Sequence, residues 1–184
     1  DGICRDKKMI SGKSKIIESS SGNLGVALSI VCKSINIPFT CVTDLNTNPN
    51  NIKLMELYGA NVICVTERDK NGGYLGTRIK TIQQMLTNDP YLIWTNQYEN
   101  QDNPLAHYLT TANEISQEFP HVDYLFIGAG TTGTLMGCAK YFREKLPLTK
   151  IIAVDAEGSV TFGQPAKKRH IPGLGTSKRP PIVD

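Results

Sequence analysis

Short runs rich in β-branched and aromatic residues alternate with stretches of helical period along nearly the whole chain. The runs predict six strands, at residues 15–18, 39–43, 61–66, 91–95, 124–127 and 150–155. The helical stretches cover residues 23–35, 50–58, 74–87, 104–119 and 132–146. Strand and helix in alternation favour parallel sheets with right-handed crossovers and helices on both faces. We therefore expect an α/β fold of two three-layer lobes with mostly parallel sheets, in which all six strands are buried.

An amide-rich segment marks the boundary between the two lobes. Five of the eight residues from Asn96 to Asn103 are Asn or Gln, a composition typical of a connection between domains. We expect one lobe at residues 1–96 and a second at residues 97–184. Two local signals agree with the predicted helices: Gly59 follows one of them directly, and Asn71-Gly72-Gly73 supplies a turn before another.

Composition and charge exclude several classes of partner. The 184 residues carry 20 Lys and Arg against 17 Asp and Glu, and the net charge of +3 is too mild for a nucleic-acid-binding protein. The longest apolar run, Gly25 to Cys32, falls far short of the roughly 18 residues that cross a bilayer. We therefore expect small-molecule partners, with neither nucleic acid nor a membrane.

The cysteines and histidines indicate neither a disulfide framework nor a metal site. The five cysteines are odd in number and form no C-x-x-C pair, which favours the reducing cytoplasm. His107, His121 and His170 are isolated, so each is interpreted as a helix, loop or surface residue and no metal is expected. Because the chain begins at Asp1 without an initiator Met and ends without an amphipathic helix, we expect a piece of a longer protein.

A glycine-rich turn after the fifth predicted strand has the spacing of an anion-binding loop. Gly128-Ala129-Gly130-Thr131-Thr132-Gly133 matches G-x-G-x-x-G and opens a predicted helix. Glycines let the main chain approach an anion, and the N–H groups of a helix N-terminus bind phosphate. With Asp155 at the end of the next strand to hold a ribose, this turn alone is typical of a dinucleotide site. Asp155 can instead be a structural acid at a strand end, the interpretation that we prefer.

A second turn offers hydroxyl groups in place of bare glycine. Glu18-Ser19-Ser20-Ser21-Gly22-Asn23-Leu24-Gly25 follows the first predicted strand and also opens a helix, and its hydroxyls, amide and N–H groups suit a carboxylate. Open α/β sheets bind ligands at the carboxyl ends of their strands, where both turns lie. One molecule with a phosphate at one end and an amino-acid carboxylate at the other would use both turns. Helix capping by Ser20 or Ser21 is the structural alternative.

Five segments together resemble those of one enzyme family. Ser20-Ser21-Gly22-Asn23-Leu24-Gly25 resembles the T-S-G-N-T-G substrate loop of the pyridoxal-phosphate enzymes of the cysteine synthase group, which includes cystathionine β-synthase. Gly130-Thr131-Thr132-Gly133-Thr134 resembles their G-T-G-G-T phosphate loop, and Asn96-Gln97-Tyr98 their N-Q-F. The other two segments are Tyr58-Gly59-Ala60-Asn61-Val62 and Ile171-Pro172-Gly173-Leu174-Gly175. The resemblance implies the tryptophan synthase β-like fold, incomplete at both ends, with a smaller mobile lobe first and part of the larger lobe second.

Four details are more similar to one branch of that family, the synthases that join O-phosphoserine to glutamate on the way to 2,3-diaminopropionate in siderophore pathways. They are Thr132 in place of the middle loop glycine, Tyr98 in place of Phe, and the segments 72–78 and 155–160. The resemblance implies β-replacement on O-phosphoserine or O-acetylserine through an α-aminoacrylate, with glutamate as the nucleophile. Alternatives are a cysteine synthase that uses sulfide, a non-catalytic module on the same scaffold, and a nicotinamide-dependent oxidoreductase.

The resemblance also implies roles for individual residues. Asn23 would bond the 3-hydroxyl of pyridoxal 5'-phosphate, and its phosphate would be held by Gly130, Thr131, Thr132, Gly133 and Thr134. The substrate carboxylate would be bound by Ser20, Ser21, Gly22 and Gln97, and Gly173 would also belong to the substrate site. Gln97 can instead be an ordinary amide at the lobe boundary.

No catalytic residue is assigned in this chain. The family's Schiff-base lysine lies in an N-P-x-x-S-x-K motif that none of the lysines upstream of the serine turn matches: Lys7, Lys8, Lys13 and Lys15. We expect that lysine before Asp1. The family is usually dimeric, which implies a homodimer.

Overall fold

A computed structural model describes residues 12–70, 72–171 and 173–183. The chain forms two compact units, Asp1–Asn96 and Gln97–Asp184. Asn71 of the predicted turn, Pro172 of the fifth family segment, and both Lys7 and Lys8 lie outside the described residues.

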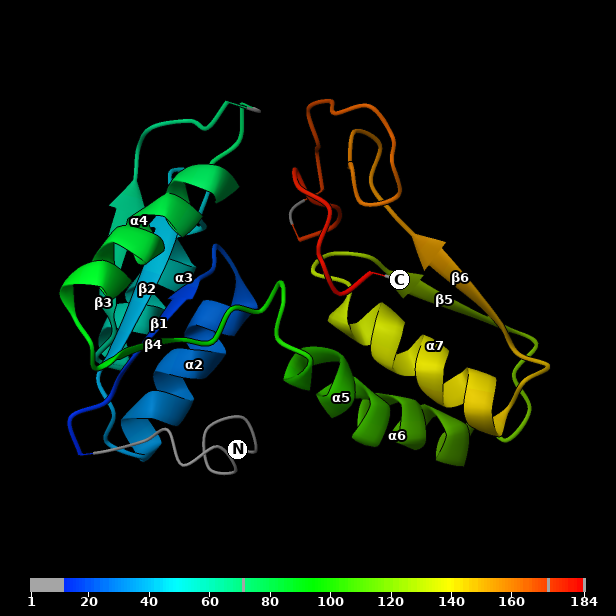
Figure 1. Cartoon of the computed structure of the whole chain (residues 1–184). Helices are drawn as coiled ribbons and strands as arrows, with labels where there is room; N and C mark the ends of the chain where they lie inside the picture. The colour runs from blue at the N-terminus through cyan, green and yellow to red at the C-terminus, as the bar shows by residue number, and fades with distance from the viewer. Residues whose placement is uncertain (1–11, 71, 172, 184) are drawn as a thin grey trace. The chain divides into compact units, whose positions relative to one another are not determined.

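The first unit is built on a four-stranded parallel sheet (Figure 1). Its strands lie in the order β3-β2-β1-β4. Their bounds are β1 Lys15–Ser19, β2 Phe39–Asp44, β3 Asn61–Val65 and β4 Leu92–Trp94. Ile17 of β1 lies opposite Thr40 on one side and Trp94 on the other, which fixes the register. The four strands predicted from β-branched runs are therefore confirmed.

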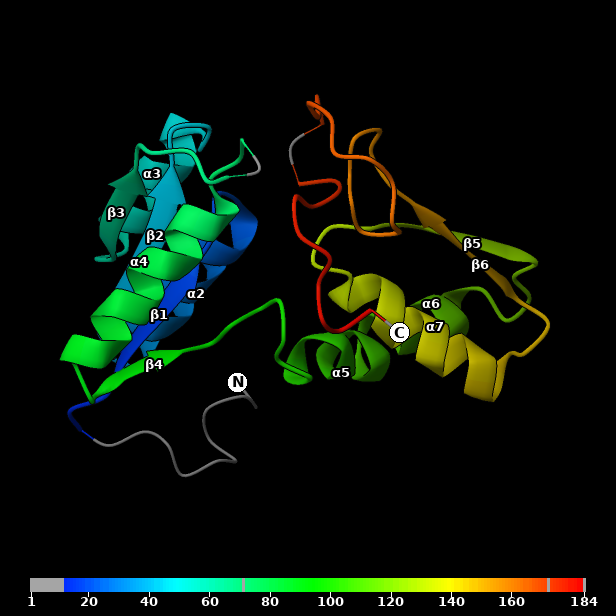
Figure 2. The same ribbon diagram turned by 45° about the horizontal axis from the view of Figure 1, so that its top comes forward.

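Helices cover both faces of this sheet. They are α2 (Asn23–Ser34), α3 (Pro49–Leu57) and α4 (Leu75–Asn88), with α2 and α3 on one side and α4 on the other (Figure 2). Because successive side chains of a strand point to opposite faces, Ile16 and Cys41 pack with α2 and α3, while Ile17 and Val42 pack with α4. The first unit thus has the three layers that the strand and helix pattern predicts.

Within its described residues, the second unit has a pair of parallel strands and three helices. The strands are β5 (Tyr124–Gly128) and β6 (Lys150–Val154), and the helices are α5 (Asp102–Leu109), α6 (Thr111–Glu118) and α7 (Gly133–Lys145). One core joins the two strands to α6 and α7, and its buried residues are Ala112, Ile127, Ala129, Leu135, Cys138 and Phe142. The α/β class and the parallel pairing are as predicted.

In the part of the chain that the structure describes, the prediction that all six strands are buried holds for β1 and β2, holds only in part for β3 and β4, and is wrong for β5 and β6. Phe126 is 66% exposed and Val154 41% exposed. Both lie on the face opposite the one that Ile127 shares with the core of α6 and α7. An apolar run shows that a strand can be covered on both sides, but it does not show which of its faces is covered within this chain.

The helix predicted at residues 104–119 is two helices. Its backbone leaves the helical path at Thr110, where φ is −111° and ψ is −79°, so α5 ends at Leu109 and α6 begins at Thr111. The hydroxyl of Thr110 donates to the carbonyl of Ala106 at 2.8 Å. Two consecutive β-branched threonines favour such a bend, because their side chains crowd the preceding turn and compete for its carbonyls.

Candidate functional site

The serine turn begins at the carboxyl end of β1, in the first unit. Ser20 is buried, and its Oγ accepts from the N–H groups of Gly22 at 3.2 Å and Gly25 at 3.1 Å. The N-cap of α2 is Gly22, which has no side-chain capping bond, so Ser20 is not the capping residue; its hydroxyl instead accepts from the N-cap and from Gly25 in the first turn. The side chains of Ser21 and Asn23 are exposed.

Gly25 gives α2 its close approach to the sheet. A Cβ at this position would lie 2.7 Å from Sδ of Met55 and 2.9 Å from Sγ of Cys41, both fully buried. The glycine at the end of the family motif therefore serves packing, and it holds the start of α2 against the ends of β1 and β2. Burial raises the pKa of the Cys41 thiol to about 12, and the nearby Glu18 carboxylate adds to the effect.

Glu18, at the end of β1 just before the serine turn, accepts hydrogen bonds from three donors. Its carboxylate is fully buried, and Oε1 accepts from the indole Nε1 of Trp94 at 3.1 Å, while Oε2 accepts from the hydroxyl of Thr95 at 2.5 Å. The same carboxylate accepts from the N–H of Ser19 at 2.6 Å. A buried carboxylate needs such donors, and here they tie the end of β1 to the end of β4.

The glycine turn of the second unit leads into α7, which begins at Gly133. Its N-cap is Thr132, with a left-handed φ of +70°, no side-chain capping bond, and no acidic residue in the first turn. The first N–H groups of a helix have no partners within the helix and carry its positive dipole end. The start of α7 therefore offers donors to an anion.

The segment around Gly173 packs directly on the glycine turn. A Cβ at Gly130 would lie 2.7 Å from the carbonyl oxygen of Gly173, and the N–H of Gly175 donates to the carbonyl of Ala129 at 2.7 Å. A buried cluster of hydroxyls holds this segment in place, formed by Ser159, Thr161 and Thr176. The structure thus brings together Gly130 and Gly173, two residues that sequence motifs far apart in the chain had indicated.

Asn103 links the segment of Gln97 to the glycine turn. Its Nδ2 donates to the carbonyl of Gln97 at 2.9 Å and to the hydroxyl of Thr131 at 3.2 Å. Sequence reasoning noted Asn103 only as the end of the amide-rich boundary and assigned it no role. The density of amides between Asn96 and Asn103 is the signal from which a binding role could have been inferred.

His107 contacts two threonines, Thr111 in α6 and Thr134 in the first turn of α7. Its Nδ1 lies 3.0 Å from Oγ1 of Thr111, and its Nε2 lies 3.1 Å from Oγ1 of Thr134. Burial lowers the pKa of His107, which favours the neutral ring. Sequence reasoning placed His107 on a helix, which is correct, but gave it no part in the site.

Asp155 has a structural contact at the end of β6. Its Oδ1 accepts from the N–H of Ala156 at 2.8 Å, and a Cβ at Gly175 would lie 2.9 Å from the same oxygen. The carboxylate is thus occupied by its own turn and packed by the segment around Gly175. This geometry supports a structural acid over a ribose-binding acid.

The donors of the glycine turn fit the phosphate of pyridoxal phosphate. Thr131 accepts from Asn103, so its own hydroxyl proton can be donated to another group. The hydroxyl of Thr132 donates to the carbonyl of Thr131 at 2.6 Å. The proton of this hydroxyl is therefore used within the turn, and the group that Thr132 can donate to a phosphate is its main-chain N–H. Hydroxyls and main-chain N–H groups at a helix start whose first turn carries no acidic residue are the chemistry that binds a phosphate.

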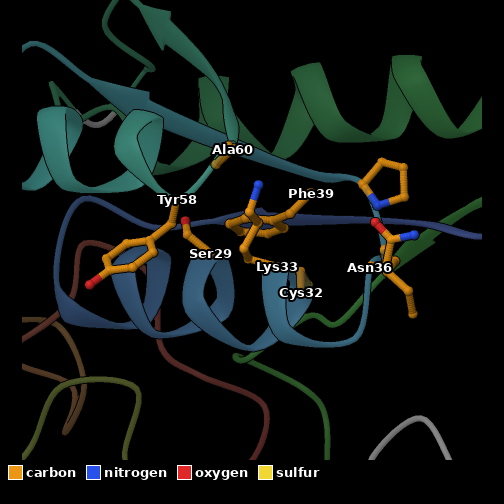
Figure 3. Close-up of a pocket in the computed structure, with 10 residues that line it drawn as sticks. Ser29, Cys32, Lys33, Asn36, Phe39, Tyr58 and Ala60 are labelled. Atoms are coloured by element: carbon orange, nitrogen blue, oxygen red, sulfur yellow. The ribbon is translucent and has the colours of Figure 1, made fainter.

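A hollow of about 280 Å³ lies elsewhere on the first unit (Figure 3). It is lined at the ends of α2 and α3 and the start of β2, by residues that include Lys33, Asn36, Phe39 and Tyr58. This is the amino end of β2, whereas the serine turn follows the carboxyl end of its neighbour β1. Because parallel sheets bind ligands at the carboxyl ends of their strands, the hollow is not part of the candidate site.

The described part of the chain shows neither a metal-binding cluster nor a membrane-spanning helix. No group of three or more His, Cys, Asp and Glu side chains within it could hold a metal ion. None of its helices is long and apolar enough to cross a membrane.

Comparisons with known proteins identify relatives over almost the whole chain. Residues 3–184 match the model of the family described as pyridoxal-phosphate dependent enzyme. An N-(2-amino-2-carboxyethyl)-L-glutamate synthase from Ralstonia nicotianae is 42% identical over 169 residues, which are 91% of this chain and 50% of the relative. A synthase of the same name from Cupriavidus metallidurans is 42% identical over 175 residues, which are 95% of this chain and 51% of the relative.

A solved structure agrees with these relatives. The O-acetylserine dependent cystathionine β-synthase from Helicobacter pylori superposes with a TM-score of 0.87 at 30% identity, over 96% of this chain and 56% of that protein. The chain thus spans about half the length of the curated relatives it matches. These findings confirm the family resemblance, the fold class and the cofactor that the loop motifs predict.

Proposed function

Because the chain belongs to the family of pyridoxal-phosphate-dependent enzymes, we propose that the full-length protein exchanges the β-substituent of an O-activated serine for a nucleophile. When bound, pyridoxal phosphate withdraws electrons from the α-carbon of the amino acid and so makes loss of the α-proton and of the β-substituent possible. The observation that carries the proposal is the donor set of the glycine turn, with the hydroxyls of Thr131 and Thr134 beside the uncapped start of α7.

The glycine turn holds the cofactor phosphate. Thr131 and Thr134 donate from their hydroxyls, and Gly130, Thr132 and Gly133 supply main-chain N–H groups and room for close approach. Asn23, exposed at the start of α2, bonds the 3-hydroxyl of the pyridoxal ring. The close packing of Gly130 on the carbonyl of Gly173 fixes the path of the turn and excludes a side chain at Gly130.

The serine turn binds the substrate carboxylate. Ser21 offers an exposed hydroxyl, and Gly22 and Asn23 add groups from the start of α2. Ser20 acts indirectly, since its hydroxyl accepts from Gly22 and Gly25 and so shapes the turn. Gln97 contributes its side-chain amide. A carboxylate held at a fixed orientation aligns the breaking bond at the α-carbon, an effect worth several kcal/mol.

Glutamate is the nucleophile and O-phosphoserine the substrate in this proposal. Two relatives at 42% identity are named as synthases of N-(2-amino-2-carboxyethyl)-L-glutamate. The segment 72–78 and Thr132 had pointed to the same branch. Use of sulfide to form cysteine is the second candidate, because a structural relative from Entamoeba histolytica, at a TM-score of 0.86 and 30% identity, is named as a cysteine synthase.

Turnover of the full-length protein tests the proposal. O-phosphoserine and O-acetylserine are each offered with glutamate or with sulfide, and products are identified by mass spectrometry. O-phosphoserine with glutamate should give the highest kcat/KM. Cysteine as the main product would overturn the assignment of glutamate, and no β-replacement product from any pair would overturn the proposed function.

A pair of serine variants tests the substrate turn. Ser21→Ala should raise the KM for the amino-acid substrate by about tenfold, the effect of one lost hydrogen bond to a charged group. Ser34→Ala is the matched control, because Ser34 is equally exposed but lies at the other end of α2. Equal KM values for the two variants would remove Ser21 from the site.

The proposal includes a homodimer in a reducing compartment. The described cysteines Cys41, Cys64 and Cys138 are free thiols, which supports the compartment. Light scattering of the purified full-length protein measures the assembly, and a monomeric mass at working concentration would contradict the dimer.

A further inference from the structure

Helices α5 and α7 meet along a pair of glycines. Gly133 and Gly137 are one helical turn apart on α7, and Asn103 and His107 are one turn apart on α5. A Cβ at Gly133 would overlap the carboxamide of Asn103, and a Cβ at Gly137 would lie 2.8 Å from Cβ of His107. The glycines therefore let Asn103 and His107 reach the first turn of α7.

The side chains of Asn103 and His107 each contact a threonine hydroxyl, one in the glycine turn and one in the first turn of α7. Asn103 donates to Oγ1 of Thr131 at 3.2 Å, and Nε2 of His107 lies 3.1 Å from Oγ1 of Thr134. A hydroxyl that accepts a hydrogen bond keeps its own proton for donation elsewhere. Two threonines that each accept from α5 would thus both be donors toward the ligand.

We propose that Asn103 and His107 are positioning residues that direct the hydroxyl protons of Thr131 and Thr134 toward the cofactor phosphate. The inference rests on the proposed function, since it takes the phosphate of pyridoxal phosphate as the acceptor. It adds two residues to the site and gives each a defined task. Neither residue touches the reacting atoms.

The inference requires one tautomer of His107. Nε2 carries the proton and donates to Thr134, while Nδ1 accepts from the hydroxyl of Thr111, which lies 3.0 Å away. Burial lowers the pKa of His107, so the ring is neutral and a single tautomer can be fixed. Thr111 is the first residue of α6, and a hydrogen bond from its hydroxyl to Nδ1 favours this tautomer.

A double-mutant cycle on the full-length protein tests the inference. The dissociation constant of pyridoxal phosphate is measured for wild type, His107→Leu, Thr134→Val and the double variant. His107→Leu should weaken binding by about threefold to tenfold in the wild-type background, the range for one hydrogen bond. It should cost nothing further in the Thr134→Val background, because the hydroxyl that it orients is gone.

Control variants separate positioning from folding. His107→Gln places an amide N–H near the position of Nε2 and should restore much of the affinity, and His121→Leu, at an exposed histidine, should change nothing. An equal loss from His107→Leu in both backgrounds would overturn the inference and leave the proposed function standing. A wild-type protein that does not bind pyridoxal phosphate would overturn both.

Nuclear magnetic resonance supplies a readout that is independent of affinity. Nitrogen-15 spectra of the histidine side chains should show His107 protonated on Nε2, and the phosphorus signal of the bound cofactor should shift in His107→Leu and in Asn103→Leu. A proton on Nδ1 of His107 in the wild-type holoenzyme would overturn the role of His107.

Discussion

The carboxamide of Asn103 occupies the space that a side chain at Gly133 would need, and it donates from there to the hydroxyl of Thr131. Gly133 thus leaves room for the amide that donates to Thr131. The same relationship recurs one turn later, where Gly137 leaves room for the main chain of α5 at Pro104 and Tyr108. The contact between α5 and α7 is therefore sensitive to single methyl groups.

Alanine at these glycines should destabilise the protein although alanine is the better helix former. Gly137→Ala gains about 1 kcal/mol of helix propensity, but overpacking costs typically about 1–3 kcal/mol, and a clash with main-chain atoms lies at the upper end. Urea unfolding measures the net loss. Gly12→Ala is the control, because a Cβ there meets nothing within 4 Å. Equal stability of Gly137→Ala and Gly12→Ala would contradict the packing described here.

Thr132 is a β-branched residue held at φ +70°, where glycine is preferred. Thr132→Ala loses the hydroxyl bond to Thr131 and keeps the strained backbone, whereas Thr132→Gly loses the bond and relieves the strain. The glycine variant should therefore be more stable than the alanine variant by about 1 kcal/mol. Thermal or urea unfolding of the two proteins decides this, and the reverse order would show that the backbone here is not strained.

The cysteines should differ sharply in reactivity. Cys64 is exposed, whereas Cys41 is fully buried and its pKa is raised to about 12, so it holds almost no thiolate at neutral pH. In a Cys4→Ser background, iodoacetamide should modify Cys64 first and Cys41 only after denaturation, as peptide mass spectrometry can follow. Modification of Cys41 as fast as Cys64 in the native protein would contradict its burial.

His107 should make stability depend on pH. Because its pKa in the folded state lies below the ordinary value of 6.5, the unfolded chain binds the proton more readily. The stabilisation from the neutral ring is fully present above pH 6.5. It is lost as the pH falls from 6.5 through the lower pKa of the folded state. Between about pH 8 and about pH 5, wild type should therefore lose more unfolding free energy than His107→Gln. Other groups, such as Asp89 beside Lys15, are common to both proteins and cancel in the difference. Parallel pH curves would contradict the burial of His107.

The strands could be predicted from sequence because each is a short β-branched run, as in Phe39–Asp44, and the helices because their period differs. The break at Thr110 could not, since both threonines there fit a helical period. The exposed face that carries Phe126 and Val154 could not be predicted either, because an apolar run does not show which elements cover the strand. Both turns were recognisable from local motifs, but Asn103 and His107 were not. Their role depends on which helix packs on α7, and this is a tertiary contact.

The proposed function depends most on Asn23 and Thr131, which are proposed as ligands of pyridoxal phosphate. Titration of the full-length protein with pyridoxal phosphate, followed by its visible absorption band, tests this most directly when wild type is compared with Asn23→Ala and Thr131→Val. The account predicts saturable binding at one cofactor per chain, weakened in both variants. Stabilisation by NADH without any binding of pyridoxal phosphate, or an unchanged affinity in Asn23→Ala, would contradict it.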